Sequence, residues 1–120
     1  MLERLRRKTE INRVFEEGRR LYSPWVALQA YQRPPGVDSE AGPRLAVVAG
    51  KRFRGSVARN RARRLLRETC RIALGESRGP WDLILIARVE VLDIPFAERL
   101  RVLASLLRQA GVLSEEVEAA

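Results

Sequence analysis

The chain has 120 residues, of which 23 are Lys or Arg and 15 are Asp or Glu, so its formal net charge is +8. A hydrophobic content of 46% suits one globular domain, and the basic character predicts a polyanionic partner, either nucleic acid or an acidic membrane surface. The absence of His excludes Ser-His, Cys-His and His-based metal sites within this chain. With a single Cys70, no membrane-spanning stretch and no signal-peptide pattern, we expect a cytoplasmic protein.

The excess charge lies in one stretch, residues 51–71. Nine of its residues are basic and only Glu68 is acidic, so the stretch carries +8 and the rest of the chain is neutral. Of the 23 basic residues 21 are Arg, which fits either a GC-rich genome or the preference of planar guanidinium groups for phosphates and bases. The function is therefore expected in residues 51–71.

A short helix is predicted over residues 9–18. Thr9 suits its N-cap, Gly18 its end, and Ile11, Val14 and Phe15 form an i, i+3, i+4 stripe. Phe15 is either a core residue or an aromatic that stacks on nucleic acid. A basic run, Arg4 to Lys8, precedes this helix.

A strand is predicted over residues 25–32, with Tyr22 in a short strand before it. Trp25 and Tyr31 share one face by parity and Val26 and Leu28 share the other, and either face can meet the core. A loop over 34–43 and an apolar strand over 44–50 follow.

The next helix is predicted over residues 56–74, with Ser56 as N-cap. A projection at about 100° per residue puts apolar side chains from Ala58 to Ala73 on one arc. Arg59, Arg63, Arg67 and Arg71 repeat every four residues on the opposite arc. Such a row of like charges destabilises an isolated helix, so a face that meets phosphates explains it better than an ordinary solvated surface.

The remainder alternates one strand and one helix. We expect a buried strand over 82–88, a connection over 89–95, and an amphipathic helix from Phe96 to about Ala110 that Gly111 ends. One domain is predicted over residues 1–113, followed by an acidic, frayed tail at 114–120. The scattered carboxylates form no metal or catalytic constellation and no glycine-rich phosphate loop is present, so the pattern predicts binding and not catalysis by the protein.

The run from Lys51 to Glu68 resembles the signature of the bacterial ribonuclease P protein component. The matching positions are Lys51-Arg52, Val57, Arg59-Asn60-Arg61, Arg63-Arg64 and Leu66 to Glu68. The remaining elements follow the family's order, so the resemblance covers about residues 2–110.

This resemblance implies a single-domain α+β fold in the order α-β-β-β-α-β-α, like the second domain of ribosomal protein S5. It includes a four-stranded sheet packed with helices and a left-handed β-α-β crossover, which the general topology rule disfavours. It also implies a subunit of a ribonucleoprotein endonuclease that removes the 5′ leader from precursor tRNA. The implied partners are the catalytic RNA and precursor tRNA, with no membrane or protein partner. Catalysis is implied for the RNA, working with Mg²⁺ that the RNA binds.

The resemblance assigns RNA binding to eight residues, which we call the basic motif: Lys51, Arg52, Arg59, Asn60, Arg61, Arg63, Arg64 and Arg67. It assigns a leader cleft between the first helix and the sheet, with Phe15 as a matching aromatic. Ile11 and Gln29 stand at cleft positions that are often aromatic in the family, so we expect weaker stacking unless Trp25 compensates. The family's loop glycine falls at Arg54, with Gly55 one place later.

Two other classes of function fit the charge. A structural RNA-binding protein of the ribosomal type would travel with ribosomal subunits. A DNA-binding protein would insert the basic helix into a major groove, but only Asn60 in the arginine array is a typical base-reading residue.

Overall fold

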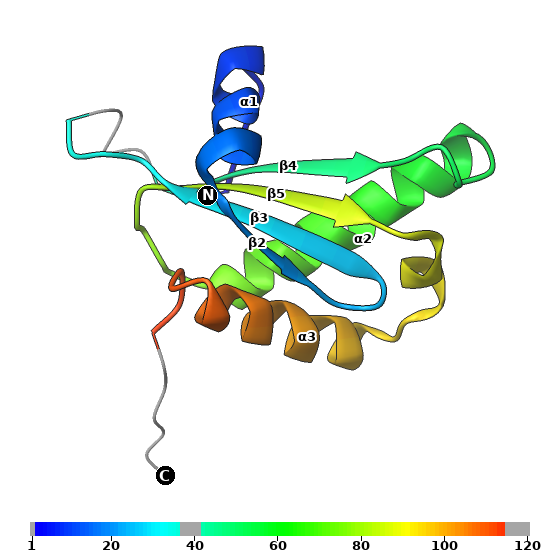
Figure 1. Ribbon diagram of the computed structural model, residues 1–120. Coiled ribbons are helices and arrows are strands. Elements are labelled where there is room, and N and C mark those ends of the chain that lie inside the picture. Colours follow the sequence, from blue (N-terminus) through cyan, green and yellow to red (C-terminus); the bar gives the residue numbers. More distant parts are fainter. Residues whose placement is uncertain (1, 37–41, 115–120) are drawn as a thin grey trace, which may run out of the picture.

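The computed structural model describes residues 2–36 and 42–114, and Figure 1 shows one mixed sheet with helices on both faces. The middle of the predicted 34–43 loop and most of the predicted acidic tail lie outside the described residues. The elements in chain order are β1 (Glu3–Arg4), α1 (Lys8–Glu17), β2 (Arg19–Tyr22), β3 (Val26–Gln32), β4 (Arg44–Ala49), α2 (Gly55–Leu74), β5 (Trp81–Ala87), the 3-10 helix η1 (Val89–Asp93) and α3 (Phe96–Gln109).

The sheet has the strand order β1-β4-β5-β3-β2. Strands β4 and β5 are parallel neighbours, and α2 connects them, whereas β3 pairs antiparallel with both β5 and β2. In Figure 1 both parallel strands point the same way and α2 crosses behind the sheet, which makes the crossover left-handed. The predicted α+β fold and its unusual crossover are thus confirmed.

The predicted four-stranded sheet is wrong by one strand, because the chain start adds β1 to the edge of β4. Glu3 pairs with Arg44 and Arg4 with Leu45 in parallel register. The Leu5 amide then donates to the Leu45 carbonyl at 2.9 Å, which continues the ladder by one residue. Two residues are too few to produce a readable alternation, so the sequence pattern could not reveal this strand.

Two apolar clusters lie on opposite faces of the sheet. The larger one joins the sheet to α2 and α3 and includes Val26, Leu28 and Ala30 of β3. The smaller one lies under α1 and consists of Leu5, Val14 and Ile84, with Ile11 and Tyr31 packed against it. The sequence did not decide which face of β3 meets the main core. In the structure its even-numbered apolar residues face α2 and α3.

Both predicted helix N-caps are wrong. Helix α1 begins at Lys8 and α2 at Gly55, and the residues before them, Arg7 and Arg54, make no side-chain capping bond. Gly55 has φ +83°, a conformation that glycine adopts without strain, and this lets the chain turn into α2 one residue early. The predicted end at Gly18 is correct, since its amide donates to the Val14 carbonyl at 2.8 Å.

Gly18 is also sterically required where α1 meets the sheet. A Cβ at this position would lie 2.5 Å from the Val14 carbonyl oxygen and 2.8 Å from the Ala30 carbonyl oxygen. Only a residue without a side chain lets the end of α1 approach β3 this closely. In residues 2–36 and 42–114, no helix is long and apolar enough to cross a membrane.

Candidate nucleic-acid interface

The basic motif occupies α2 and the loop that leads into it. Lys51 and Arg52 lie in the β4–α2 loop and are exposed, and the other six residues lie in the first 13 positions of α2. Ala62, Leu66, Thr69, Cys70 and Leu74 bury the opposite side of the helix in the larger cluster. The predicted two-sided character of this helix is correct, except that Ile72, on the predicted apolar arc, is 39% exposed.

The seven cations of the basic motif form no salt bridge with any residue that the structure describes. Arg63 donates to the Asn60 side-chain oxygen at 3.0 Å, and Arg59 donates to the Phe53 carbonyl at 3.5 Å. These are bonds to neutral groups, so the positive charge is not compensated. A row of arginines without carboxylates fits a surface whose counter-charge comes from a partner.

One cation of α2 does have a carboxylate partner. Arg71, outside the basic motif, donates to Glu68 at 2.6 Å, and this hydrogen bond lowers the pKa of the Glu68 carboxyl. Both side chains are exposed, so the pair contributes little to stability. Next to it, burial raises the pKa of the Cys70 thiol to about 12, which keeps the thiol neutral and unreactive.

The basic motif spreads over both flanks of α2. Arg61 lies on the α3 flank, where its charge adds to the effect of burial in lowering the pKa of Arg99. Arg99 is itself held at the start of α3 by bonds to Ile94 and Thr69. Arg67 lies on the opposite flank of α2, and farther along the helix Leu2 and Glu3 of the N-terminal segment line a hollow together with Arg71 and Ile72. The motif therefore does not form one compact patch.

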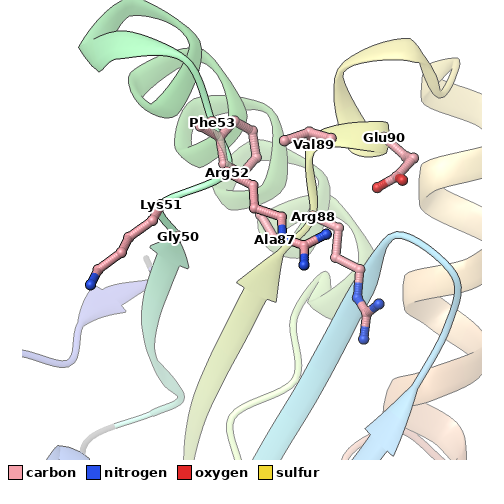
Figure 2. A pocket seen from close by; sticks show the side chains of 8 residues that line it. All are labelled: Gly50, Lys51, Arg52, Phe53, Ala87, Arg88, Val89 and Glu90. Carbon is pink, nitrogen blue, oxygen red and sulfur yellow. The ribbon is translucent and has the colours of Figure 1, made fainter.

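A cavity of about 330 Å³ opens where β4 and β5 end. Lys51, Arg52 and the buried Phe53 line it from the β4–α2 loop, and Arg88 and Glu90 line it from the other side. In Figure 2 the side chains of Arg52 and Arg88 extend in the same direction past Ala87, whereas Lys51 points away to the other side. This end of the sheet thus carries positive charge from two separate loops.

The face of the sheet next to α1 presents an apolar row that crosses four strands. Val48 of β4 pairs with Ile86, Ile86 with Ala27, and Ala27 with Tyr22 of β2. Tyr22 is 62% exposed and Val48 is 40% exposed, although both belong to strands. Helix α1 packs over the neighbouring residues Ile84, Tyr31 and Ala46, and Ile86 packs against the same cluster. Because Ala27 is buried as well, the row is exposed only at its two ends, Tyr22 and Val48.

The structure separates the four predicted cleft residues. Phe15 is 41% exposed on α1, and Ile11 is half-buried against the smaller cluster. Gln29 is buried on the α1 side of β3. Trp25 instead belongs to the larger cluster on the other face and is only 4% exposed, so it cannot compensate on the cleft side. It lies just before β3 begins, where the strand parity used for the prediction does not apply.

Gln29 connects three elements on the α1 side. Its amide nitrogen donates to the Val14 carbonyl at 3.2 Å and the Gly18 carbonyl at 3.3 Å, which ties the end of α1 to β3. Its oxygen accepts a 2.7 Å hydrogen bond from Arg20 Nε. The Arg20 guanidinium also lies over the Tyr22 ring, 5.7 Å from its centre. Gln29 thus orients a cation beside the exposed end of the apolar row.

A buried ion network fixes the base of α1. The Asp82 carboxylate accepts a hydrogen bond from Arg33 at 2.6 Å and two from Arg44, at 2.8 and 2.9 Å. Arg44 also reaches Glu10 of α1 at 3.3 Å. The network joins β4, β5, the end of β3 and α1, so its arginines have a structural role.

Sequence reasoning missed five residues of these surfaces, namely Arg20, Tyr22, Val48, Ile86 and Arg88. Arg20 and Tyr22 follow Gly18, which marks the end of a helix. This position suggests that a new strand begins there, but it does not show which strands lie beside it. The others come together only through the register between strands, which no local pattern specifies. In the described parts of the chain, no group of three or more Cys, Asp or Glu side chains could hold a metal ion.

The fold and these surfaces define a class of protein, a small α+β domain with an uncompensated basic helix and an open, partly aromatic sheet face. Residues 2–111 match the family model described as Ribonuclease P, and the chain belongs to this family. The predicted resemblance is therefore confirmed.

Relatives and solved structures agree with this assignment. The ribonuclease P protein component of Chloroflexus aurantiacus is 37% identical over 111 residues, which cover 92% of this chain and 78% of the relative. That of Dehalococcoides mccartyi is 34% identical and covers 96% and 90%. The RNase P protein of Staphylococcus aureus superposes with a TM-score of 0.75 at 20% identity, covering 93% of this chain and 98% of the other. At this identity the last comparison establishes the fold alone.

Proposed function

We propose that this chain is the protein component of a ribonuclease P, and that it binds the catalytic RNA through α2 and the β4–α2 loop. The observation that carries the proposal is the set of seven motif cations without a carboxylate partner in the described residues. Phosphates of a folded RNA would supply the missing negative charge, and arginine suits them because its planar fork can donate two hydrogen bonds. Membership of the Ribonuclease P family supports the choice of the catalytic RNA as the partner.

In this proposal the RNA, not the protein, cuts the precursor tRNA. The RNA would hold Mg²⁺ ions that activate the attacking water and stabilise the leaving oxygen. The contribution of the protein is to hold the two RNAs together, which raises the affinity for substrate and reduces the Mg²⁺ concentration that folding and cleavage require.

The 5′ leader of precursor tRNA would lie on the α1 side of the sheet. Tyr22 and Phe15 offer exposed rings for stacking of bases, and Val48 extends the apolar surface between the strands. The cation just after the end of β5, Arg88, would meet the leader phosphates. A single strand fits because both kinds of contact tolerate any base sequence.

Ile11 and Gln29 stand at positions that are often aromatic in the family, so this surface offers fewer rings for stacking. Neither side chain offers a ring, and Gln29 is buried with both ends of its amide bonded. Part of the stacking expected of the family would thus be replaced here by Arg20, which Gln29 holds beside Tyr22. Leader binding in this protein would therefore depend more on salt than stacking alone would require.

Reconstitution with the catalytic RNA from the same organism tests the proposal. The protein is expected to lower the Mg²⁺ concentration needed for cleavage and to raise the affinity for precursor tRNA over mature tRNA. A structural RNA-binding protein would bind RNA without either effect and would sediment with ribosomal subunits. If neither cleavage nor precursor affinity changes, the proposed function is wrong.

A further inference from the structure

The N-terminal basic segment has no role in the function described so far, yet β1 brings it against α2. Leu5 packs with Val14 and Ile84 on the α1 side of the sheet, whereas Leu2 packs against the larger cluster on the α2 side. Because side chains alternate along a strand, Arg4 lies on the α2 side. This places Arg4 on the same flank of α2 as Arg67.

Arg67 is the member of the basic motif with the most unusual surroundings. Its side chain is half-buried, and its Nη1 atom is inaccessible to solvent and has no hydrogen-bond partner among the residues that the structure describes. Burial lowers the pKa of Arg67, and the charges of Arg4 and Arg6 lower it further. A buried donor without a partner is costly, and nearby cations add to the cost.

The neighbouring carboxylates do not relieve this cluster. Glu68 is bonded to Arg71, and Glu10 is bonded to Arg44. Glu3 alternates with Arg4 along β1, so its side chain points away from that of Arg4. Arg4, Arg6 and Arg67 thus come from two distant parts of the chain, and none of them forms an ion pair with a carboxylate of the described residues.

We propose that Arg4, Arg6 and Arg67 form a clamp that binds one phosphate group of the catalytic RNA. This inference rests on the proposed function and extends the RNA interface from α2 across to β1. A phosphate offers several acceptor oxygens, so it can bond to more than one guanidinium at once. The pairing of β1 with β4 would then hold Arg4 on the side of the sheet where Arg67 lies.

The clamp is tested by the salt dependence of binding to the ribonuclease P RNA, for Arg4→Ala, Arg67→Ala and the double variant. If both arginines hold one phosphate, the double variant loses about one unit of slope in the plot of log affinity against log salt. The second substitution also reduces the affinity less than the first one, because contacts to a shared group are not additive. Arg108→Ala removes the same charge from the far end of α3 and is expected to leave the slope unchanged.

A loss of about two units would mean two independent phosphates and would overturn the clamp. So would an affinity for Arg4→Ala that equals the affinity for Arg108→Ala. Since Arg67→Ala also removes a half-buried stem, Arg67→Lys serves as a second variant that keeps the charge but loses the planar fork. The wild-type protein in the same titrations separates the two proposals, because a wrong proposed function would abolish preferential binding of this RNA even without any substitution.

Discussion

Two arginine-rich regions of this molecule have opposite surroundings. On the α1 side, Arg33 and Arg44 are almost enclosed and share the Asp82 carboxylate, with Glu10 as a further partner of Arg44. On α2 and its loop, seven cations of the basic motif have no carboxylate in the described residues. Arginine therefore joins elements of the fold in the first region, whereas in the second region it remains available to bind a partner molecule.

The difference shows why a charge count does not distinguish structure from function. A buried arginine must be neutralised inside the protein, since its desolvation is expensive, and this fixes an acidic residue close to it. A surface arginine that binds RNA needs no internal partner, and a carboxylate beside it would weaken binding. The position of the acids, more than that of the arginines, separates the two roles.

Replacement of Asp82 tests the paired region and should have the largest effect. In Asp82→Asn the charges of Arg33 and Arg44 lose their shared partner, so we expect the free energy of unfolding to fall by about 3–5 kcal/mol. Chemical denaturation measures this loss. Glu98→Gln is the control, because the exposed pair of Glu98 with Arg101 should contribute at most about 1 kcal/mol. Equal effects in the two variants would mean that the buried network does not hold the fold.

Removal of arginines that have no carboxylate partner should weaken RNA binding but leave stability almost unchanged. For the double variant Arg63→Ala/Arg64→Ala we expect the salt slope of RNA binding to fall by about two units, while the free energy of unfolding changes by less than about 0.5 kcal/mol. Filter binding at several salt concentrations and thermal unfolding measure the two quantities. Arg101→Ala/Arg108→Ala removes two exposed charges from α3 and should leave the slope nearly intact.

The aromatic surface on the α1 side should respond to the leader and not to the catalytic RNA. Tyr22→Ala is expected to weaken precursor tRNA binding by about 1–3 kcal/mol, the value of one stacked base, without changing mature tRNA binding. Competition between the two tRNAs in the reconstituted complex measures this difference. Phe96→Ala is the matched control, because Phe96 is 42% exposed at the start of α3, a helix that packs on the opposite face of the sheet. Similar losses for both variants would exclude a specific leader contact at Tyr22.

The smallest effect is expected at the one paired arginine of α2. Glu68→Gln should release Arg71, and RNA affinity should rise modestly with a slope steeper by at most about one unit. Acidification should not mimic this change near neutral pH, because the bond from Arg71 lowers the pKa of Glu68 and the carboxylate stays ionised. We therefore expect binding to be constant between about pH 6 and 8, where no His titrates in this chain. A marked pH dependence there would show that another group controls the contact.

The parts that the sequence predicted well are those with long local patterns. Helix α2 spans 20 residues, enough turns for the apolar and basic arcs to separate clearly, and the Arg59-Asn60-Arg61 run indicated the family. The apolar run at 82–88 likewise revealed a strand, β5, that is buried on both faces.

The parts that it missed depend on neighbours across the sheet. Tyr22 and Val48 share a row only through the registers of three strand pairs, and Asp82 meets its arginines in the same way. Trp25 was assigned to the wrong face because it stands just before the strand whose parity was used. The two-residue β1, which carries Arg4 to α2, has no pattern of its own.

The central claim is that opposite faces of one sheet hold different RNAs, and site-specific photocrosslinking in the reconstituted complex tests it most directly. A photoreactive amino acid replaces either Glu68 on α2 or Tyr22 on the sheet, so that no cation of the basic motif is lost. We predict that position 68 crosslinks to the catalytic RNA and position 22 to the 5′ leader of precursor tRNA. Crosslinks from both positions to the same RNA, or the reverse assignment, would contradict the claim.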